Sequence, residues 1–270
     1  MKIGLSAASL YLYPLRYTFR LAKELGFSGL ELAMGPEVRW RGGSYLRRLA
    51  QEHGLSLFSL HPPMFSGSGG PKMEEILPRM VDLGKEAGCE MLVVHAPKAQ
   101  NLKEGKGLRY LEALCRAQED WGGDICLENR GFFGQKDWEY VLSDLRELRG
   151  FAQEHGLFLT LDVAHAASFG YDLLEAYRIC QPRLASLHLS DFRPRSPLGQ
   201  WHWFQTFFQH HQIPGEGNLP LKELLCCLRE DGYSGPVILE VSPFALQAWW
   251  PGRARRNLKR SLVYLGESPC

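Results

Sequence analysis

Residues 152–165, AQEHGLFLTLDVAH, contain the repeating pattern from which we predict the fold. A segment of helix-forming residues ends at Gly156, and glycine after a last helical turn readily adopts the left-handed conformation that closes a helix. The apolar run 157–161 follows and ends on Asp162. The same order of helix, glycine and apolar run recurs at 22–32, 50–60, 84–94 and 229–240. This alternation predicts repeated βαβ units and a parallel sheet.

The whole chain divides into eight such units. We expect strands near 2–8, 28–33, 55–61, 90–96, 124–129, 157–163, 184–190 and 236–242. We expect helices near 15–26, 43–54, 72–88, 106–118, 136–155, 171–181, 219–231 and 253–265. Eight β/α units most simply close as a barrel, and 270 residues that are 45% hydrophobic can bury the core of one domain. We therefore predict an α/β fold, a single (β/α)8 TIM barrel with eight parallel strands over residues 1–270.

Six of the apolar runs end on a histidine or a carboxylate. These residues are His61, His95, Glu128, Asp162, His188 and Glu240. Burying an ionisable group is costly unless it is paired or bound to a metal, so a core strand gains nothing by ending on one. Because parallel strands bring their ends to one rim, the pattern predicts a metal site at the C-terminal face of the barrel.

The donor types indicate which ions this site would take. Glu128, Asp162, His188 and Glu240 come from four successive strands, and three carboxylates with one imidazole suit Mn²⁺, Zn²⁺, Mg²⁺ or Co²⁺ without distinguishing among them. His61 and His95 would form a second site if Glu128 bridges two ions. We expect one or two ions per chain, and pairs of ions are common in hydrolytic phosphate chemistry.

Further candidates follow the strand ends. His165 lies just past one of them, where it could contact substrate, bind metal or orient a ligand; we expect a substrate or metal contact. His211 is a second candidate substrate contact. Arg193 could bind a carbonyl or phosphate oxygen through its planar guanidinium, and a surface arginine is the alternative. His202 and His210 are expected to be solvated loop histidines.

The connection 190–220 is long and rich in aromatic residues. It includes Trp201, Trp203, Phe204, Phe207 and Phe208. Long connections inside compact domains usually have a function, and the aromatic residues favour an ordered segment. We expect a loop that covers the substrate.

Composition excludes several classes of function. With 31 basic and 30 acidic side chains the net charge is +1, which provides no general field for nucleic acid or an anionic membrane; a local patch for nucleic acid stays open. The seven cysteines form no C-x-x-C motif, and no apolar run is long enough for a signal peptide or a membrane span. We expect a cytoplasmic protein with reduced thiols and no membrane association. A homo-oligomer is left open, because the aromatic loops could pack against another subunit.

Six short motifs occur in order at the predicted strand ends and the last long loop. They are VVHAP (93–97), LENR (127–130), DVAHA (162–166), HLSD (188–191), HxxPGEGxLPL (211–221) and ILEVS (238–242). In this order they resemble the xylose isomerase-like TIM-barrel superfamily, which contains sugar isomerases and epimerases, hydroxypyruvate-isomerase-like proteins and endonuclease IV. The resemblance covers nearly the whole chain.

For the isomerase and epimerase members, the resemblance implies one metal ion held by Glu128, Asp162, His188 and Glu240. The two glutamates would lie on opposite faces of a hydroxy-ketone. One of them would remove the proton beside the carbonyl, and the cation would stabilise the resulting enediolate. The predicted function is an isomerase or epimerase of a small sugar, sugar phosphate or hydroxy-keto acid.

Endonuclease IV gives the alternative, a zinc phosphodiesterase acting on abasic DNA. There the resemblance implies three zinc ions, with His165 and His211 in part of the third site. That site also takes an aspartate two residues before the second histidine, where this chain has Gln209. A barrel that binds metal or ligand without isomerase chemistry is a third class, because one fold hosts many reactions.

Overall fold

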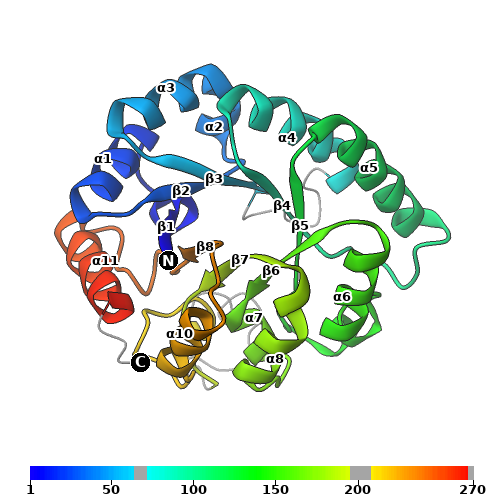
Figure 1. Ribbon diagram of the computed structural model, residues 1–270. Helices are drawn as coiled ribbons and strands as arrows, with labels where there is room; N and C mark the ends of the chain where they lie inside the picture. Colours follow the sequence, from blue (N-terminus) through cyan, green and yellow to red (C-terminus); the bar gives the residue numbers. More distant parts are fainter. Residues whose placement is uncertain (64–71, 195–207, 267–270) are drawn as a thin grey trace.

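The computed structural model describes residues 1–63, 72–194 and 208–266. Eight parallel strands form a closed barrel in chain order. They are β1 (Lys2–Ser6), β2 (Gly29–Ala33), β3 (Ser56–His61), β4 (Met91–His95), β5 (Asp124–Glu128), β6 (Phe158–Asp162), β7 (Leu184–Leu189) and β8 (Pro236–Leu239). Figure 1 looks along the barrel from the end at which the strands begin. The predicted (β/α)8 barrel is confirmed.

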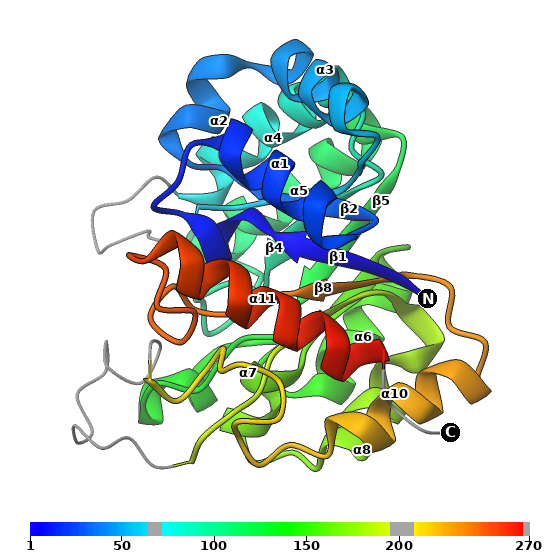
Figure 2. The same ribbon diagram turned by 90° about the vertical axis from the view of Figure 1, so that its left-hand side faces the viewer.

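The helices surround the strands and return the chain in the opposite direction. They are α1 (Leu15–Leu25), α2 (Pro36–Arg41), α3 (Gly43–His53), α4 (Met73–Ala87), α5 (Gly105–Trp121), α6 (Leu145–Glu154), α7 (Val163–Ser168), α8 (Leu173–Cys180), α10 (Leu221–Glu230) and α11 (Pro251–Gly266). Short 3-10 turns occupy Ala7–Leu10, Gln135–Glu139 and Gln181–Arg183. In Figure 2 the strands run from right to left, so the C-terminal face lies on the left.

Helix ends follow the repeated sequence signature. The two copies of AQEHGL end α3 and α6, and the glycines that follow, Gly54 and Gly156, have φ values of +60° and +67°. Side chains with a Cβ rarely adopt this conformation, so glycine is the residue that lets the chain turn into the next strand.

One helix prediction was wrong in its extent. The sequence predicts a continuous helix near 136–155, but the structure has a 3-10 turn at Gln135–Glu139 and begins α6 only at Leu145. Asp144 explains the break, because its side chain accepts hydrogen bonds from the backbone N–H groups of Arg146 and Glu147. An N-cap of this kind satisfies the first free donors of a helix and so fixes where the helix starts.

The two ends of the barrel interior differ in polarity. At the end where the strands begin, the ring of Phe58 fills the barrel; a Cβ on Gly4 would come within 2.9 Å of it and one on Gly29 within 2.7 Å. Towards the other end the interior is polar, and Thr160 Oγ1 and Ser186 Oγ lie 2.9 Å apart as buried neighbours in the β6–β7 register. An apolar floor therefore closes the barrel beneath a polar mouth.

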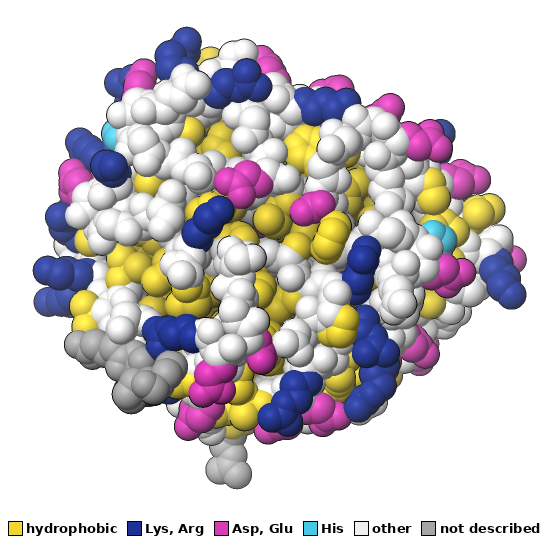
Figure 3. Space-filling model, in the orientation of Figure 1, with side chains coloured by type: hydrophobic (Ala, Val, Ile, Leu, Met, Phe, Trp, Pro, Cys, Tyr) yellow, Lys and Arg dark blue, Asp and Glu magenta, His cyan; other side chains and the backbone are white. Residues whose placement is uncertain are grey.

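The surface agrees with the near-neutral composition. Figure 3 shows the face at which the strands begin, where basic and acidic side chains both occur around the rim. Among the helices of residues 1–63, 72–194 and 208–266, none has the length and hydropathy needed to cross a membrane.

Candidate metal centre

The six predicted donors all reach the mouth of the barrel. His61, His95, Glu128 and Asp162 are the last residues of β3, β4, β5 and β6; His188 is the penultimate residue of β7, and Glu240 directly follows β8. Strand pairing brings these donors together in two pairs. His95 is in register with Glu128, and Asp162 is in register with His188.

The first group of donors contains three carboxylates and one imidazole. Each residue offers one ligand atom, and these four atoms all lie within 4.8 Å of one another. The residues are Glu128, Asp162, His188 and Glu240. All four side chains are buried, with at most 4% of any residue exposed. His188 Nδ1 lies 2.9 Å from Glu240 Oε2 and 3.3 Å from Glu128 Oε1. We call these residues the four-donor group.

The four-donor group has the properties of a cation site. Asp162 Oδ2, His188 Nδ1 and Glu240 Oε2 are buried and have no hydrogen-bond partner, since the short approach of Nδ1 to Glu240 lacks hydrogen-bond geometry. Buried polar atoms without partners are costly, and a shared cation would satisfy all three at once. Three oxygen donors and one imidazole suit a divalent ion, so these residues fit the predicted metal.

The charged side chains of this group shift one another's pKa values. Burial by itself would raise the pKa of Glu240, but the His188 imidazole lowers it to about 2. Burial also opposes ionisation of Glu128, yet His95 and His188 hold its pKa well below the usual range. In return the carboxylates of Glu31, Glu240 and Glu128 overcome burial and raise the pKa of His188 well above normal. The His188 imidazole and these carboxylates therefore favour one another's charged forms.

A second group shares Glu128. His61 Nε2 lies 3.0 Å and His95 Nε2 3.1 Å from Glu128 Oε2, whereas Oε1 of the same carboxylate faces His188. His61 Nδ1 lies 2.8 Å from the carbonyl oxygen of Pro62, to which it can donate, and Nε2 would then be free as a ligand atom. The geometry is thus compatible with a second ion that Glu128 bridges.

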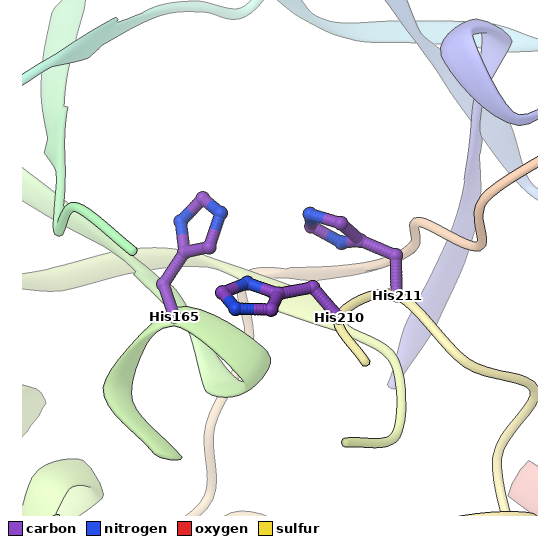
Figure 4. A group of neighbouring side chains, drawn as sticks. All are labelled: His165, His210 and His211. Atoms are coloured by element: carbon purple, nitrogen blue, oxygen red, sulfur yellow. The ribbon is translucent and has the colours of Figure 1, made fainter. Parts of the chain in front are cut away.

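A third group contains His165, His210 and His211, whose rings lie together in Figure 4. His165 Nδ1 lies 3.0 Å from the carbonyl oxygen of Asn129. This group borders the four-donor group, because His165 Nδ1 lies 3.6 Å from Glu128 Oε1. All three histidines offer ring nitrogens to the same small volume.

The prediction for His210 was wrong. Instead of being solvated, His210 is 1% exposed, and its ring stacks on Phe133 with 4.8 Å between ring centroids. Burial, reinforced by the neighbouring His165 and His211, holds its pKa well below the usual range. Its Nδ1 is buried without a hydrogen-bond partner. His210 is therefore a neutral imidazole with an unused ring nitrogen beside the site.

The backbone around His211 explains this placement. His211 has a φ of +51°, which is unusual for a residue other than glycine. Its carbonyl accepts a hydrogen bond from the backbone N–H of Ser242 at 2.7 Å, and Gln212 exchanges two backbone hydrogen bonds with Asp191. These contacts tie the segment to the ends of β7 and β8. The left-handed turn then brings two consecutive histidine rings to the same side.

Two predictions concerned the loop after β7. Arg193 donates from Nε to the carbonyl oxygen of Glu216 at 2.8 Å and pairs with its carboxylate at 3.1 Å, with 43% of the side chain exposed. This contact favours the surface alternative over substrate binding. His202 and residues 195–207 of the proposed covering loop lie outside the described residues.

One buried carboxylate at the mouth was missed by sequence reasoning. Glu31 lies within β2, is 0% exposed and lies 2.9 Å from His188 Nε2 through Oε2. The available indication was an acidic residue inside the apolar run GLELA (29–33). A rule that considers only the last position of each strand passes over it.

Comparison with known proteins agrees with this barrel. The family described as xylose isomerase-like TIM barrel matches residues 19–261, so the chain belongs to that family. A Mycobacterium bovis protein whose name states no function is 27% identical over 265 residues, covering 90% of this chain and 89% of the relative. Fructoselysine 3-epimerase of Shigella flexneri is 23% identical and covers 89% and 90% of the two chains.

Among solved structures, D-psicose 3-epimerase of Clostridium cellulolyticum H10 superposes with a TM-score of 0.72. The alignment covers 99% of each chain at 17% identity, which is a likeness of fold. The resemblance drawn from the six sequence motifs is confirmed at the level of the family.

Proposed function

We propose that this protein is a divalent-metal-dependent isomerase or epimerase of a small sugar, sugar phosphate or hydroxy-keto acid. The observation that carries the proposal is the four-donor group, which joins two glutamates to a cation-binding set with unpartnered buried atoms. The names of two similar proteins, fructoselysine 3-epimerase and D-psicose 3-epimerase, support the class of reaction.

Glu128 and Glu240 are the proposed acid and base groups. A bound cation would supply positive charge where negative charge develops on the substrate oxygen. One glutamate removes the proton beside the carbonyl. In an isomerisation the same group, now protonated, returns that proton; in an epimerisation the second glutamate returns one and must carry it when the substrate binds. The low pKa of Glu240, about 2, keeps that carboxylate in its basic form across the physiological range. Burial excludes water, which would otherwise compete for the transferred proton.

His165 and His211 are the proposed substrate contacts. If His165 Nδ1 donates to the carbonyl oxygen of Asn129, its Nε2 is left as a hydrogen-bond acceptor for a substrate hydroxyl. His211 Nδ1 lies 3.8 Å from Asp162 Oδ2, so its ring borders the four-donor group. Both imidazoles would then orient hydroxyl groups of a substrate held at the cation.

Solvent exchange tests this function across many candidate substrates at once. The metal-loaded protein would be incubated in D₂O with a panel that includes psicose, tagatose and fructoselysine, and deuterium uptake at the carbon beside the carbonyl would be followed by NMR. Proton transfer predicts deuterium uptake that requires metal. If no hydroxy-ketone or keto acid of the panel takes up deuterium, the result would contradict the proposal.

The second candidate is phosphodiester hydrolysis with more than one ion. It is favoured by Glu128, whose two oxygens face separate groups of donors, and by the histidines His61 and His95. Metal analysis of the purified protein discriminates the two candidates. One ion per chain would favour isomerisation; two or more, together with chelator-sensitive incision of an abasic-site duplex, would favour hydrolysis.

A further inference from the structure

Glu31 is a buried carboxylate that the proposed proton transfer does not use. It lies in the middle of β2 and is fully excluded from solvent. Its Oε2 accepts a hydrogen bond from Ser59 Oγ at 2.8 Å and lies 2.9 Å from His188 Nε2. A carboxylate at this depth is costly unless its neighbours compensate it. Its two partners therefore indicate a defined structural role.

The contact with Glu31 decides which ring nitrogen of His188 is available. Glu31 Oε2 already accepts a hydrogen bond from Ser59 Oγ, and with the same oxygen as the acceptor of the second contact, His188 Nε2 bears the ring hydrogen. In a neutral imidazole the other nitrogen, Nδ1, then presents its lone pair. That atom points into the four-donor group, 2.9 Å from Glu240 Oε2 and 3.3 Å from Glu128 Oε1. We infer that Glu31 is a positioning residue that sets the orientation and tautomer of His188 so that Nδ1 serves as the ligand atom.

The fold holds this contact from two directions. In the closed barrel β8 and β1 separate β2 from β7, so the contact between Glu31 and His188 crosses the interior. Ser59, the partner of Glu31 in the β2–β3 register, fixes the carboxylate from the neighbouring strand. A ligand histidine whose second nitrogen donates to a carboxylate keeps one ring orientation, and loss of such a partner typically lowers metal affinity about 10–100-fold.

The test compares metal affinity in matched variants. Glu31→Gln should weaken Zn²⁺ and Mn²⁺ binding about 10–100-fold in competition with a chromogenic chelator. Ser59→Ala should shift the affinity in the same direction by less. Glu86→Gln is the control: Glu86, near the C-terminal end of α4, accepts from the Gly43 N–H and Ser44 Oγ at the opposite end of the barrel, so its loss should leave affinity unchanged.

A second measurement needs no variant of Glu31. Ring-nitrogen NMR of ¹⁵N-histidine-labelled, Zn²⁺-loaded wild-type protein, assigned by comparison with His188→Gln, should show metal at Nδ1 and hydrogen at Nε2 of His188. Metal bound through Nε2 would overturn the inference even if Glu31→Gln fails to fold.

The inference rests on the proposed metal centre, and the outcomes separate the two. Equal affinities in the wild-type protein and Glu31→Gln would overturn the role of Glu31 alone. A wild-type protein that binds neither ion would overturn the metal centre, and the role of Glu31 with it.

Discussion

Glu240→Gln removes a proposed base and one negative charge from the four-donor group while keeping the shape of the side chain. At saturating metal we expect deuterium exchange into substrate to fall about 10²–10⁴-fold, the usual contribution of a general acid or base. Assay at saturating metal separates loss of chemistry from loss of the ion. Full exchange activity in Glu240→Gln would refute the role of Glu240.

The structure also sets the effect of this variant on stability. In the metal-free protein the pKa of Glu240 is lowered from 4.5 to about 2. A lowered pKa means that the ionised form stabilises the fold above the ordinary pKa, and this contribution is lost as the pH falls towards 2. The shift corresponds to roughly 3 kcal/mol as an upper bound, since one pKa unit is about 1.4 kcal/mol. Glutamine resembles the protonated form, so the variant should be less stable at pH 7 by no more than this amount.

Thermal unfolding measures this difference. For a chain of this size about 3 kcal/mol corresponds to a fall of about 10 °C at most in Tm, and the gap between the wild-type protein and the variant should narrow at about pH 3. Glu112→Gln is the matched control, because Glu112 is exposed on α5 and pairs only with Arg116 among its described ionic contacts. A gap that widens on acidification would contradict the assigned sign.

Three further predictions follow from the same geometry. Gly131→Ala should destabilise the fold by about 1–3 kcal/mol in denaturant unfolding, because the added Cβ would lie 2.7 Å from His165 Cδ2 and 3.1 Å from His210 Cε1; unchanged stability would contradict this packing. Burial would lower the pKa of His61, but Glu128 raises it to about 9. In the absence of metal the protonated His61 should therefore add roughly 3 kcal/mol at most to the free energy of unfolding. This contribution is complete below pH 6.5 and is lost as the pH rises through 9. Equal free energies of unfolding at pH 6 and pH 10 would refute this contribution of His61. Addition of Mn²⁺ or Zn²⁺ at about 100 times the dissociation constant should stabilise the protein by about 3 kcal/mol in thermal unfolding, and chelator should reverse this; no shift in Tm would count against the metal centre.

Much of the fold and of the candidate site was predictable, because both depend on local pattern. Alternation of apolar runs with helical segments predicts the order of elements, and a polar residue at or just after the end of an apolar run indicates candidate donors such as Asp162 and Glu240. Parallel strands bring those ends to one rim whatever the details of packing. Errors arose where a local capping contact competed with helical periodicity, as Asp144 does before α6.

His210 shows why part of the site was out of reach. In the sequence it lies in the polar run QHHQ (209–212) of a long connection, and such a run does not by itself predict burial. Its position depends on the stacking partner Phe133, which is distant along the chain, and on the left-handed turn at His211. That turn is fixed by hydrogen bonds to Asp191 and Ser242, which are distant along the chain.

Short stretches of sequence are enough to predict which residues stand at the carboxyl ends of the strands, since strand period and polarity are properties of short segments. Which of those residues come into contact depends on how the distant strands pack together. Closure of the barrel brings Glu31 of β2 against His188 of β7, and it turns the two oxygens of Glu128 towards different groups of histidines. Contacts across a barrel depend on its curvature and on side-chain packing, and no short stretch of sequence encodes either.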